Sequence, residues 1–191
     1  MWALTLAVLA FSYLLGSFPT AYLAGRLASG CDIRQMGDGN MGAQNAFHLF
    51  GPRVGIGVGI VDCFKGMAAI SVASIADVPL SVTLLAGILV VAGHNWPVFL
   101  HFRGGRGEAT TIGVLLMLVT LPMTIAGTAC ILTLIKTRNV SIASVPLFVL
   151  LPLLGVLFHV SGVLIVYGMV LPIIVALTHL SRVRAKAPHT A

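Results

Sequence analysis

Long apolar stretches alternate with short polar stretches along almost the whole chain. A helix satisfies its own backbone hydrogen bonds in lipid, so an apolar stretch of about 20 residues predicts a membrane-spanning helix. The pattern therefore predicts an all-α integral membrane protein, with one transmembrane helical domain over residues 1–180 and a short basic cytoplasmic tail over residues 181–191. The apolar stretches are residues 2–28, 54–76, 80–100, 109–135, 141–158 and 162–178.

The apolar stretch of residues 109–135 is unusually long and has Pro122 near its middle. Basic residues flank both of its ends, at Arg106 and Lys136. Because basic loops gather on the cytoplasmic side, we expect two short helices of about 13 residues that meet near Pro122. This gives seven helical transmembrane segments, two of them short, with the N-terminus outside and the C-terminus inside. The alternative is one long tilted helix and six spans.

The composition agrees with a membrane protein and argues against other classes. Hydrophobic residues make up 58% of the chain and charged residues only 8%, whereas a soluble domain carries about 25% charged residues. The net charge of +6 comes from basic residues at the ends of apolar stretches, so we expect contact with the lipid bilayer and no nucleic-acid binding. The three cysteines have no metal-ligand spacing, which gives no reason to expect a metal site.

The first polar stretch contains the sequence GDGNMGAQN at residues 37–45. Its three glycines permit positive φ angles and a close approach of backbone N–H groups, which can form a nest for an anion. Asn40, Gln44 and Asn45 add neutral hydrogen-bond donors and acceptors. An ordinary flexible turn is the other interpretation, because a lone glycine motif is weak evidence for a ligand.

The second polar stretch, FRGGRGEAT at residues 102–110, alternates two arginines with three glycines and runs into an apolar segment. Arginine forks suit phosphate, and a helix N-terminus adds donors. The alternative is a basic loop that binds lipid headgroups without specificity. In the third polar stretch, Ser141 is a candidate helix cap, and Ser144 could face a ligand or bond to its own helix.

Several ionisable residues lie within or beside the apolar stretches, where charge is costly. Asp62 and Lys65 are three residues apart, so they share one helical face and either neutralise each other, reach a partner helix or contact substrate. His94 is a candidate general base or a hydrogen-bonded packing residue. His48 and His179, at the cytoplasmic boundary, are candidate proton acceptors.

In their order along the chain, the motifs resemble those of the bacterial membrane-embedded glycerol-3-phosphate acyltransferases that use acyl phosphate as donor. The resemblance implies transfer of a fatty acyl group from acyl phosphate to the 1-hydroxyl of glycerol 3-phosphate, giving lysophosphatidic acid in phospholipid synthesis. It also implies a multi-pass protein of the inner or plasma membrane, with seven transmembrane helices, an active site at the cytoplasmic face, and no metal ion, coenzyme A or other cofactor. The likeness covers nearly the whole chain and rests on LLGSFPTAYLAGRL at 14–27, DIRQMGDGNMGAQN at 32–45, the D-x-x-K-G pattern at 62–66, GHNWPVF at 93–99, the glycine-arginine loop at 103–110 and VSIAS at 140–144.

The residue patterns and the resemblance together give a set of candidate site residues. The candidate catalytic residues are Asp38, Asn45, His94 and His179. The candidate substrate- and phosphate-binding residues are Gly37, Gly39, Asn40, Gly42, Gln44, His48, Arg103, Gly104, Gly105, Arg106, Gly107, Thr110, Ser141 and Ser144.

The chain departs from the usual family pattern at several of these positions. Asp38 stands in place of a serine, Gln44 in place of a threonine, and His48 in place of an arginine. In the second loop arginines replace the usual lysines, which keeps the charge and changes the geometry. Arg182 stands where the family has an asparagine, and the C-terminal Gly-x-Glu is absent. Two alternatives therefore stay open: an acyltransferase with a different acceptor or donor, and a non-enzymatic paralogue that binds lipid or a membrane partner.

Overall fold

The structure is a computed structural model that describes residues 2–184, apart from the side chains of Val140, Ser141, Phe148 and residues 181–184. All secondary structure within this range is helical, as the sequence predicts. The α-helices are α1 (Trp2–Ser17), α2 (Thr20–Ser29), α3 (Ala43–Phe50), α4 (Pro52–Ile75), α5 (Leu80–Asn95), α6 (Glu108–Leu118), α7 (Thr120–Thr137), α8 (Val140–Leu157) and α9 (Gly162–Arg184), with short 3-10 helices η1 (Ile33–Gln35) and η2 (Val98–Leu100).

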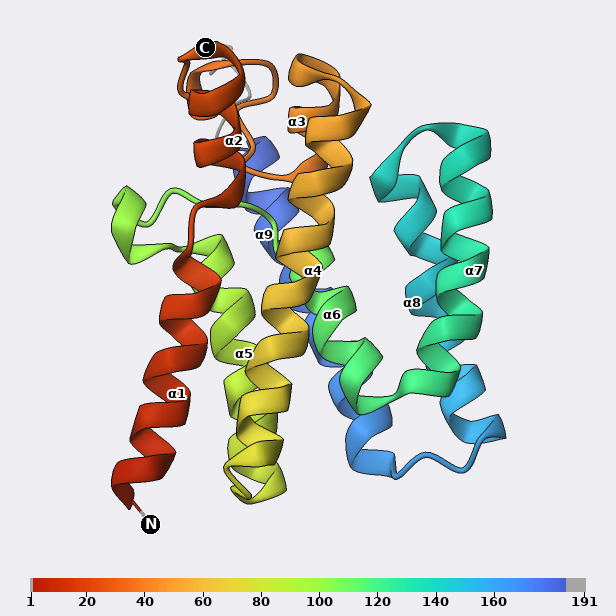
Figure 1. The fold of residues 1–191 in the computed structure, drawn as a ribbon. Helices are drawn as coiled ribbons and strands as arrows, with labels where there is room; N and C mark the ends of the chain where they lie inside the picture. The colour runs from red at the N-terminus through yellow and green to blue at the C-terminus, as the bar shows by residue number, and fades with distance from the viewer. Residues whose placement is uncertain (1, 185–191) are drawn as a thin grey trace.

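The long helices lie side by side, and the short helices α2 and α3 gather at one end of the bundle (Figure 1). The start of α1 lies at the opposite end from α2, α3 and the last turns of α9 (Figure 1). The buried core joins α4 through α9 and includes Val90, Leu115, Leu147 and Leu171. Large apolar side chains remain exposed along the outer faces of the helices, as at Trp2, Leu153 and Leu177, which is the pattern of a helix bundle that contacts lipid.

Within the described part of the chain, five segments are long and apolar enough to cross a membrane. Two further helices, α6 and the described part of α8, are apolar but shorter. The chain is therefore an integral membrane protein of several apolar helices, while the count of seven crossings and the orientation of the termini stay predictions. The five segments are Trp2–Ser29, Pro52–Ile75, Leu80–Leu100, Thr120–Thr137 and Gly162–Leu180.

The predicted division of residues 109–135 into two helices is confirmed. Helix α6 ends at Leu118, and Val119 leaves the helical conformation with φ −137° and ψ 57° before α7 begins. Pro122 then falls in the first turn of α7, where a missing N–H costs no intrahelical hydrogen bond. The two helices are unequal, with 11 and 18 residues, rather than about 13 each.

The predicted first span over residues 2–28 agrees with the apolar segment Trp2–Ser29, but this segment consists of two helices. Helix α1 ends at Ser17, and α2 begins at Thr20, after a break at Phe18 and Pro19. Proline has no backbone N–H and disfavours the helical conformation of the residue before it. These two effects of Pro19 explain why the helix breaks at Phe18 and Pro19. The carbonyl group of Phe18 instead accepts a hydrogen bond of 2.6 Å from the Lys65 ammonium group.

Three further boundaries differ from the predictions. The polar stretch of residues 29–53 is not all loop, because it contains η1 and the amphipathic helix α3. Helix α5 ends at Asn95 rather than at residue 100. Helix α9 continues to Arg184, so the predicted start of the tail at residue 181 lies inside a helix, and residues 185–191 lie outside the described range.

Glycine permits a close helix contact between α4 and α6. A Cβ atom added to Gly113 would overlap the backbone carbonyl of Cys63, and one added to Gly66 would overlap the carbonyl of Thr110. Small residues let two helix backbones approach each other in this way. The contact fixes the start of α6, and with it the second polar loop, against α4.

Candidate functional site

The first polar loop is shaped by the Asn45 side chain at the start of α3. Its amide nitrogen donates hydrogen bonds of 3.1 Å to the carbonyl groups of both Met36 and Asn40. Its amide oxygen accepts a hydrogen bond of 3.3 Å from the backbone N–H of Asp38. Gly37 adopts a positive φ angle, and a Cβ there would overlap Asn45. The buried Asn45 therefore holds the loop together from inside.

The second polar loop is folded onto the end of α5. The N–H of Gly104 donates to the carbonyl of Asn95 over 3.2 Å, and the N–H of Gly105 donates to the carbonyl of His94 over 3.0 Å. A Cβ at Gly105 would overlap the His94 imidazole, so only glycine fits at this position. Gly107, with φ +83°, then turns the chain into α6.

An ion pair between Asp38 and Arg106 joins the two polar loops. The nearest atoms, Asp38 Oδ2 and Arg106 Nη2, are 3.0 Å apart. The other carboxylate oxygen of Asp38 accepts a hydrogen bond of 2.9 Å from the N–H of Asn40. The Asp38 side chain is 47% exposed and that of Arg106 only 17%, so the carboxylate covers a mostly buried guanidinium from the solvent side.

Two more predicted residues belong to this group through α8 and α9. The Ser144 hydroxyl on α8 lies close enough to the Glu108 carboxylate, at the start of α6, to interact with it. His179 on α9 lies close enough to Arg106 and Asp38 to interact electrostatically with both. Asp38, Asn40, Arg106, Ser144 and His179, from four separate parts of the chain, are thus connected around the start of α6.

Five buried polar atoms in this region have no hydrogen-bond partner among the described residues. An unsatisfied buried polar group costs free energy, so such atoms are rare unless a ligand or water satisfies them. Here they lie in the two polar loops and the first turn of α6. They are Asn40 Oδ1, Arg106 Nε, Glu108 Oε1, Thr110 Oγ1 and Thr111 Oγ1.

Some predicted site residues are not part of this connected group. Gln44 is half-buried on α3, and His48 is exposed with its ring edge-on to Phe47 at 5.9 Å. Arg103 is exposed at the start of the second loop. Gly39 and Gly42 contribute backbone only, and the Ser141 side chain lies outside the described residues. Conversely, sequence reasoning missed Glu108 and Thr111 as members of the group.

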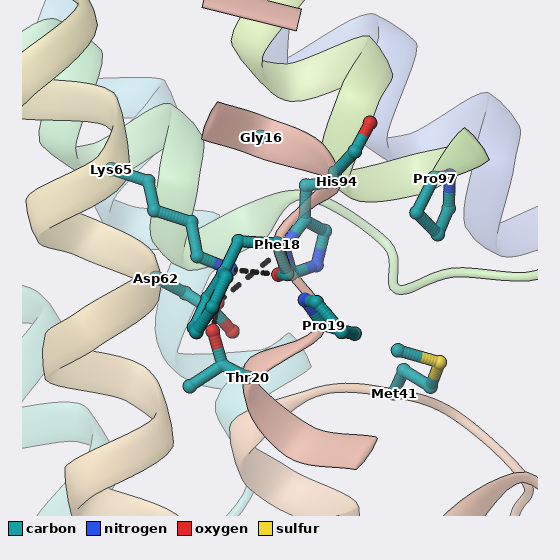
Figure 2. A pocket seen from close by; sticks show the side chains of 10 residues that line it. Gly16, Phe18, Pro19, Thr20, Met41, Asp62, Lys65, His94 and Pro97 are labelled. Atoms are coloured by element: carbon teal, nitrogen blue, oxygen red, sulfur yellow. Dashed lines mark hydrogen bonds and ion pairs between the residues drawn. The ribbon is translucent and has the colours of Figure 1, made fainter. Parts of the chain in front are cut away.

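A second polar cluster, centred on Asp62 of α4, lies at the break between α1 and α2. Lys65 Nζ donates to Asp62 Oδ1 over 2.7 Å, and the Thr20 hydroxyl donates to the same oxygen over 2.9 Å. His94 Nδ1 lies 3.7 Å from it. Figure 2 shows these side chains converging, with the Phe18 ring beside them. The predicted pairing of Asp62 with Lys65 is confirmed, and it also connects α4 to the first span.

This Asp62 cluster lines a small recess (Figure 2). Met41 of the first loop and Pro97 after α5 form part of its wall. The second loop is hydrogen-bonded to the backbone carbonyl of His94. The Asp62 cluster is therefore connected to the loop that carries Arg106. His94 therefore lies between Asp62 and the second loop, and its role as a general base or a packing residue stays a prediction. Within residues 2–184, no group of three or more His, Cys, Asp or Glu side chains is arranged to hold a metal ion.

Arg34 fixes the start of the first loop. Its guanidinium group pairs with Asp32 at 2.7 Å, donates to the carbonyl of Leu100 over 3.3 Å, and lies 5.4 Å from the Tyr22 ring centre. The hydrogen bonds from Arg34 hold the pKa of the Asp32 carboxyl below its usual value of 3.8. Because Leu100 lies just before the second loop, Arg34 is a second tie between the two loops.

The sequence and the fold both match known acyltransferases. A family model described as "Glycerol-3-phosphate acyltransferase" matches residues 6–186. Glycerol-3-phosphate acyltransferase 4 of Dehalococcoides mccartyi is 49% identical over 173 residues, covering 91% of this chain and 94% of the relative. Glycerol-3-phosphate acyltransferase of Geotalea daltonii is 38% identical over 173 residues, covering 91% and 89%.

Two crystal structures of PlsY (YgiH), an integral membrane glycerol 3-phosphate acyltransferase, share the fold. Its glycerol 3-phosphate form superposes with a TM-score of 0.81 at 26% identity, covering 94% of this chain and 90% of PlsY. Its lysophosphatidic acid form gives a TM-score of 0.79 at 24% identity over the same shares of both chains, which supports likeness of fold alone.

Proposed function

The chain belongs to the glycerol-3-phosphate acyltransferase family, and we propose that its two polar loops bind acyl phosphate and glycerol 3-phosphate. The acyl group passes to the 1-hydroxyl of glycerol 3-phosphate, and lysophosphatidic acid and inorganic phosphate are the products. The acyltransferase activity follows from the family, whereas the acyl-phosphate donor and the roles of individual residues are the parts that we propose.

The observation that carries this proposal is the Asp38–Arg106 ion pair beside unpartnered buried polar atoms. Arg106 presents a guanidinium whose Nε has no partner among the described residues. The N-terminus of α6 adds backbone N–H groups two residues further on, and this combination is typical of phosphate sites. A phosphoryl group bound there would displace the Asp38 carboxylate, because both are anions that seek the same guanidinium.

In the proposed reaction the 1-hydroxyl oxygen attacks the acyl carbonyl carbon, and the bond from that carbon to the phosphate oxygen breaks. The hydroxyl proton passes to the His179 imidazole, and the electron pair of the broken bond leaves with phosphate. Arg106 and the N-terminus of α6 stabilise the negative charge that the departing phosphate gains. Asn45 contributes by fixing the loop that orients both substrates.

We also propose that the polar end of the bundle faces the cytoplasm and that the chain crosses the membrane seven times. The polar segments of residues 29–51 and 95–107, which carry Arg34 and Arg103, lie at that end, and Arg53 follows at the start of α4 (Figure 1). Basic loops favour the cytoplasmic side. The turns at the other end are short and lack arginine and lysine, as at residues 76–79 and 158–161.

A direct assay tests the function. Protein purified in detergent is given acyl phosphate and labelled glycerol 3-phosphate, and the labelled lipid products are then separated from the unreacted glycerol 3-phosphate. Formation of labelled lysophosphatidic acid and release of phosphate supports the proposal. Acylation of another acceptor but not glycerol 3-phosphate would assign a different acceptor, and bound lipid without any acyl transfer would make the chain a non-enzymatic paralogue.

A further inference from the structure

Glu108, the first residue of α6, has no role in the reaction described above. Its carboxylate lies within reach of the Ser144 hydroxyl on α8. Its Oε1 atom is buried and has no hydrogen-bond partner among the described residues. Arg106 and Cys130 are close enough to interact with it electrostatically. Glu108 therefore lies where α6, α7 and α8 meet, beside the guanidinium that we assign to phosphate.

A buried carboxylate oxygen without a donor is costly, and the remedy must be a hydrogen-bond donor. A phosphoryl group supplies it poorly, because at neutral pH it is mostly a dianion that accepts hydrogen bonds and repels a carboxylate. A neutral hydroxyl group supplies it well. A ligand that suits both Arg106 and Glu108 therefore carries an anionic phosphoryl group and, a few bonds away, a free hydroxyl.

We propose that Glu108 is a specificity-determining residue that accepts a hydrogen bond from the non-reacting 2-hydroxyl of the acceptor. This inference rests on the proposed function, in which the 1-hydroxyl lies beside His179 and the phosphate beside Arg106. Ser144 is then a positioning residue, because its hydrogen bond orients the carboxylate. The pair selects polyol phosphates over phosphates of simple alcohols.

The test compares glycerol 3-phosphate with 3-hydroxypropyl phosphate, which lacks only the 2-hydroxyl group. Dissociation constants are measured by calorimetry for the wild type, Glu108→Leu, Glu108→Gln and Ser144→Ala, and kcat/KM for both acceptors is measured where turnover occurs. The wild type should prefer glycerol 3-phosphate by roughly tenfold to a hundredfold, the range for a hydrogen bond to a charged group. Glu108→Leu should bind both ligands equally, and Glu108→Gln and Ser144→Ala should retain part of the preference.

A ratio within one variant is insensitive to partial loss of folded protein, which affects both ligands alike. Equal binding of the two ligands by the wild type would overturn the inference, as would an unchanged preference in Glu108→Leu. If the wild type shows the binding preference but no acyl transfer, the proposed reaction fails while the assignment of Glu108 stands.

Discussion

Replacing Lys65 with methionine should destabilise the fold strongly. Lys65 and Asp62 have side chains that are only 4% and 2% exposed, and their charged atoms are 2.7 Å apart. Removing one partner of a buried ion pair costs about 3–5 kcal/mol, because the other charge remains uncompensated. In Lys65→Met, the Asp62 carboxylate keeps the Thr20 hydroxyl and the nearby His94, but the carbonyl of Phe18 loses the ammonium group and keeps only the backbone N–H of Thr20. We therefore expect a loss of about 3 kcal/mol, near the lower end of this range.

The pairing itself is measured by a double-mutant cycle of Lys65→Met and Asp62→Asn. The free energy of unfolding is obtained for wild type, both single variants and the double variant by reversible denaturation in mixed micelles. The double variant should lose less stability than the two single variants combined, by about 2 kcal/mol or more, since contacting residues couple within the range of about 0.5–3 kcal/mol. Additive losses would refute the reasoning that Lys65 and Asp62 act as a pair.

The other predictions concern helix packing, the first loop and its pH dependence. Gly113→Leu should separate α4 from α6 and lower the unfolding midpoint, at a cost of about 1–3 kcal/mol; Gly127→Leu, at a site with open space, is the matched control and should cost less. Asp38→Ser should lower KM for glycerol 3-phosphate by about two- to fivefold, because a partly exposed ion pair is worth about 0.2–1 kcal/mol; a raised KM would contradict competition for the guanidinium. Because its pKa is lowered in the fold, Asp32 contributes stability that is present above pH 3.8 and lost as the pH falls through the lower folded value. The protection factors of amides in the first loop should therefore fall at acid pH in wild type and lack this transition in Asp32→Asn; identical pH profiles would exclude the pairing with Arg34.

The sequence predicts the helices well where a strong local signal exists. Apolar stretches set the fold class, and the basic flanks of residues 109–135 with Pro122 predict two helices in place of one. The same proline argument applies to Pro19, where the helix breaks between α1 and α2. The sequence does not predict this break, because the apolar pattern continues across Pro19. Only the fold places the Lys65 ammonium group next to the freed carbonyl of Phe18 and so stabilises the break.

The candidate site was only partly predictable, for a related reason. Glycine and arginine motifs mark the two loops as places for an anion, but a motif does not say which side chains face inward. In the sequence Asn45 is a candidate ligand-binding amide, whereas its four side-chain hydrogen bonds to backbone groups fix its own loop. In the sequence Glu108 is one negative charge in a basic loop. Its proximity to Ser144 is seen only in the folded structure, where α6 and α8 approach each other.

Binding of glycerol 3-phosphate tests the central claim most directly, because the account depends on Arg106 holding a phosphoryl group between the two loops. Calorimetric titration compares wild type with Arg106→Gln and with Arg53→Gln, which removes the same charge from an exposed position at the start of α4. Arg106→Gln should weaken binding by about tenfold to a hundredfold, and Arg53→Gln should leave the dissociation constant unchanged. Equal affinity in wild type and Arg106→Gln would contradict the account.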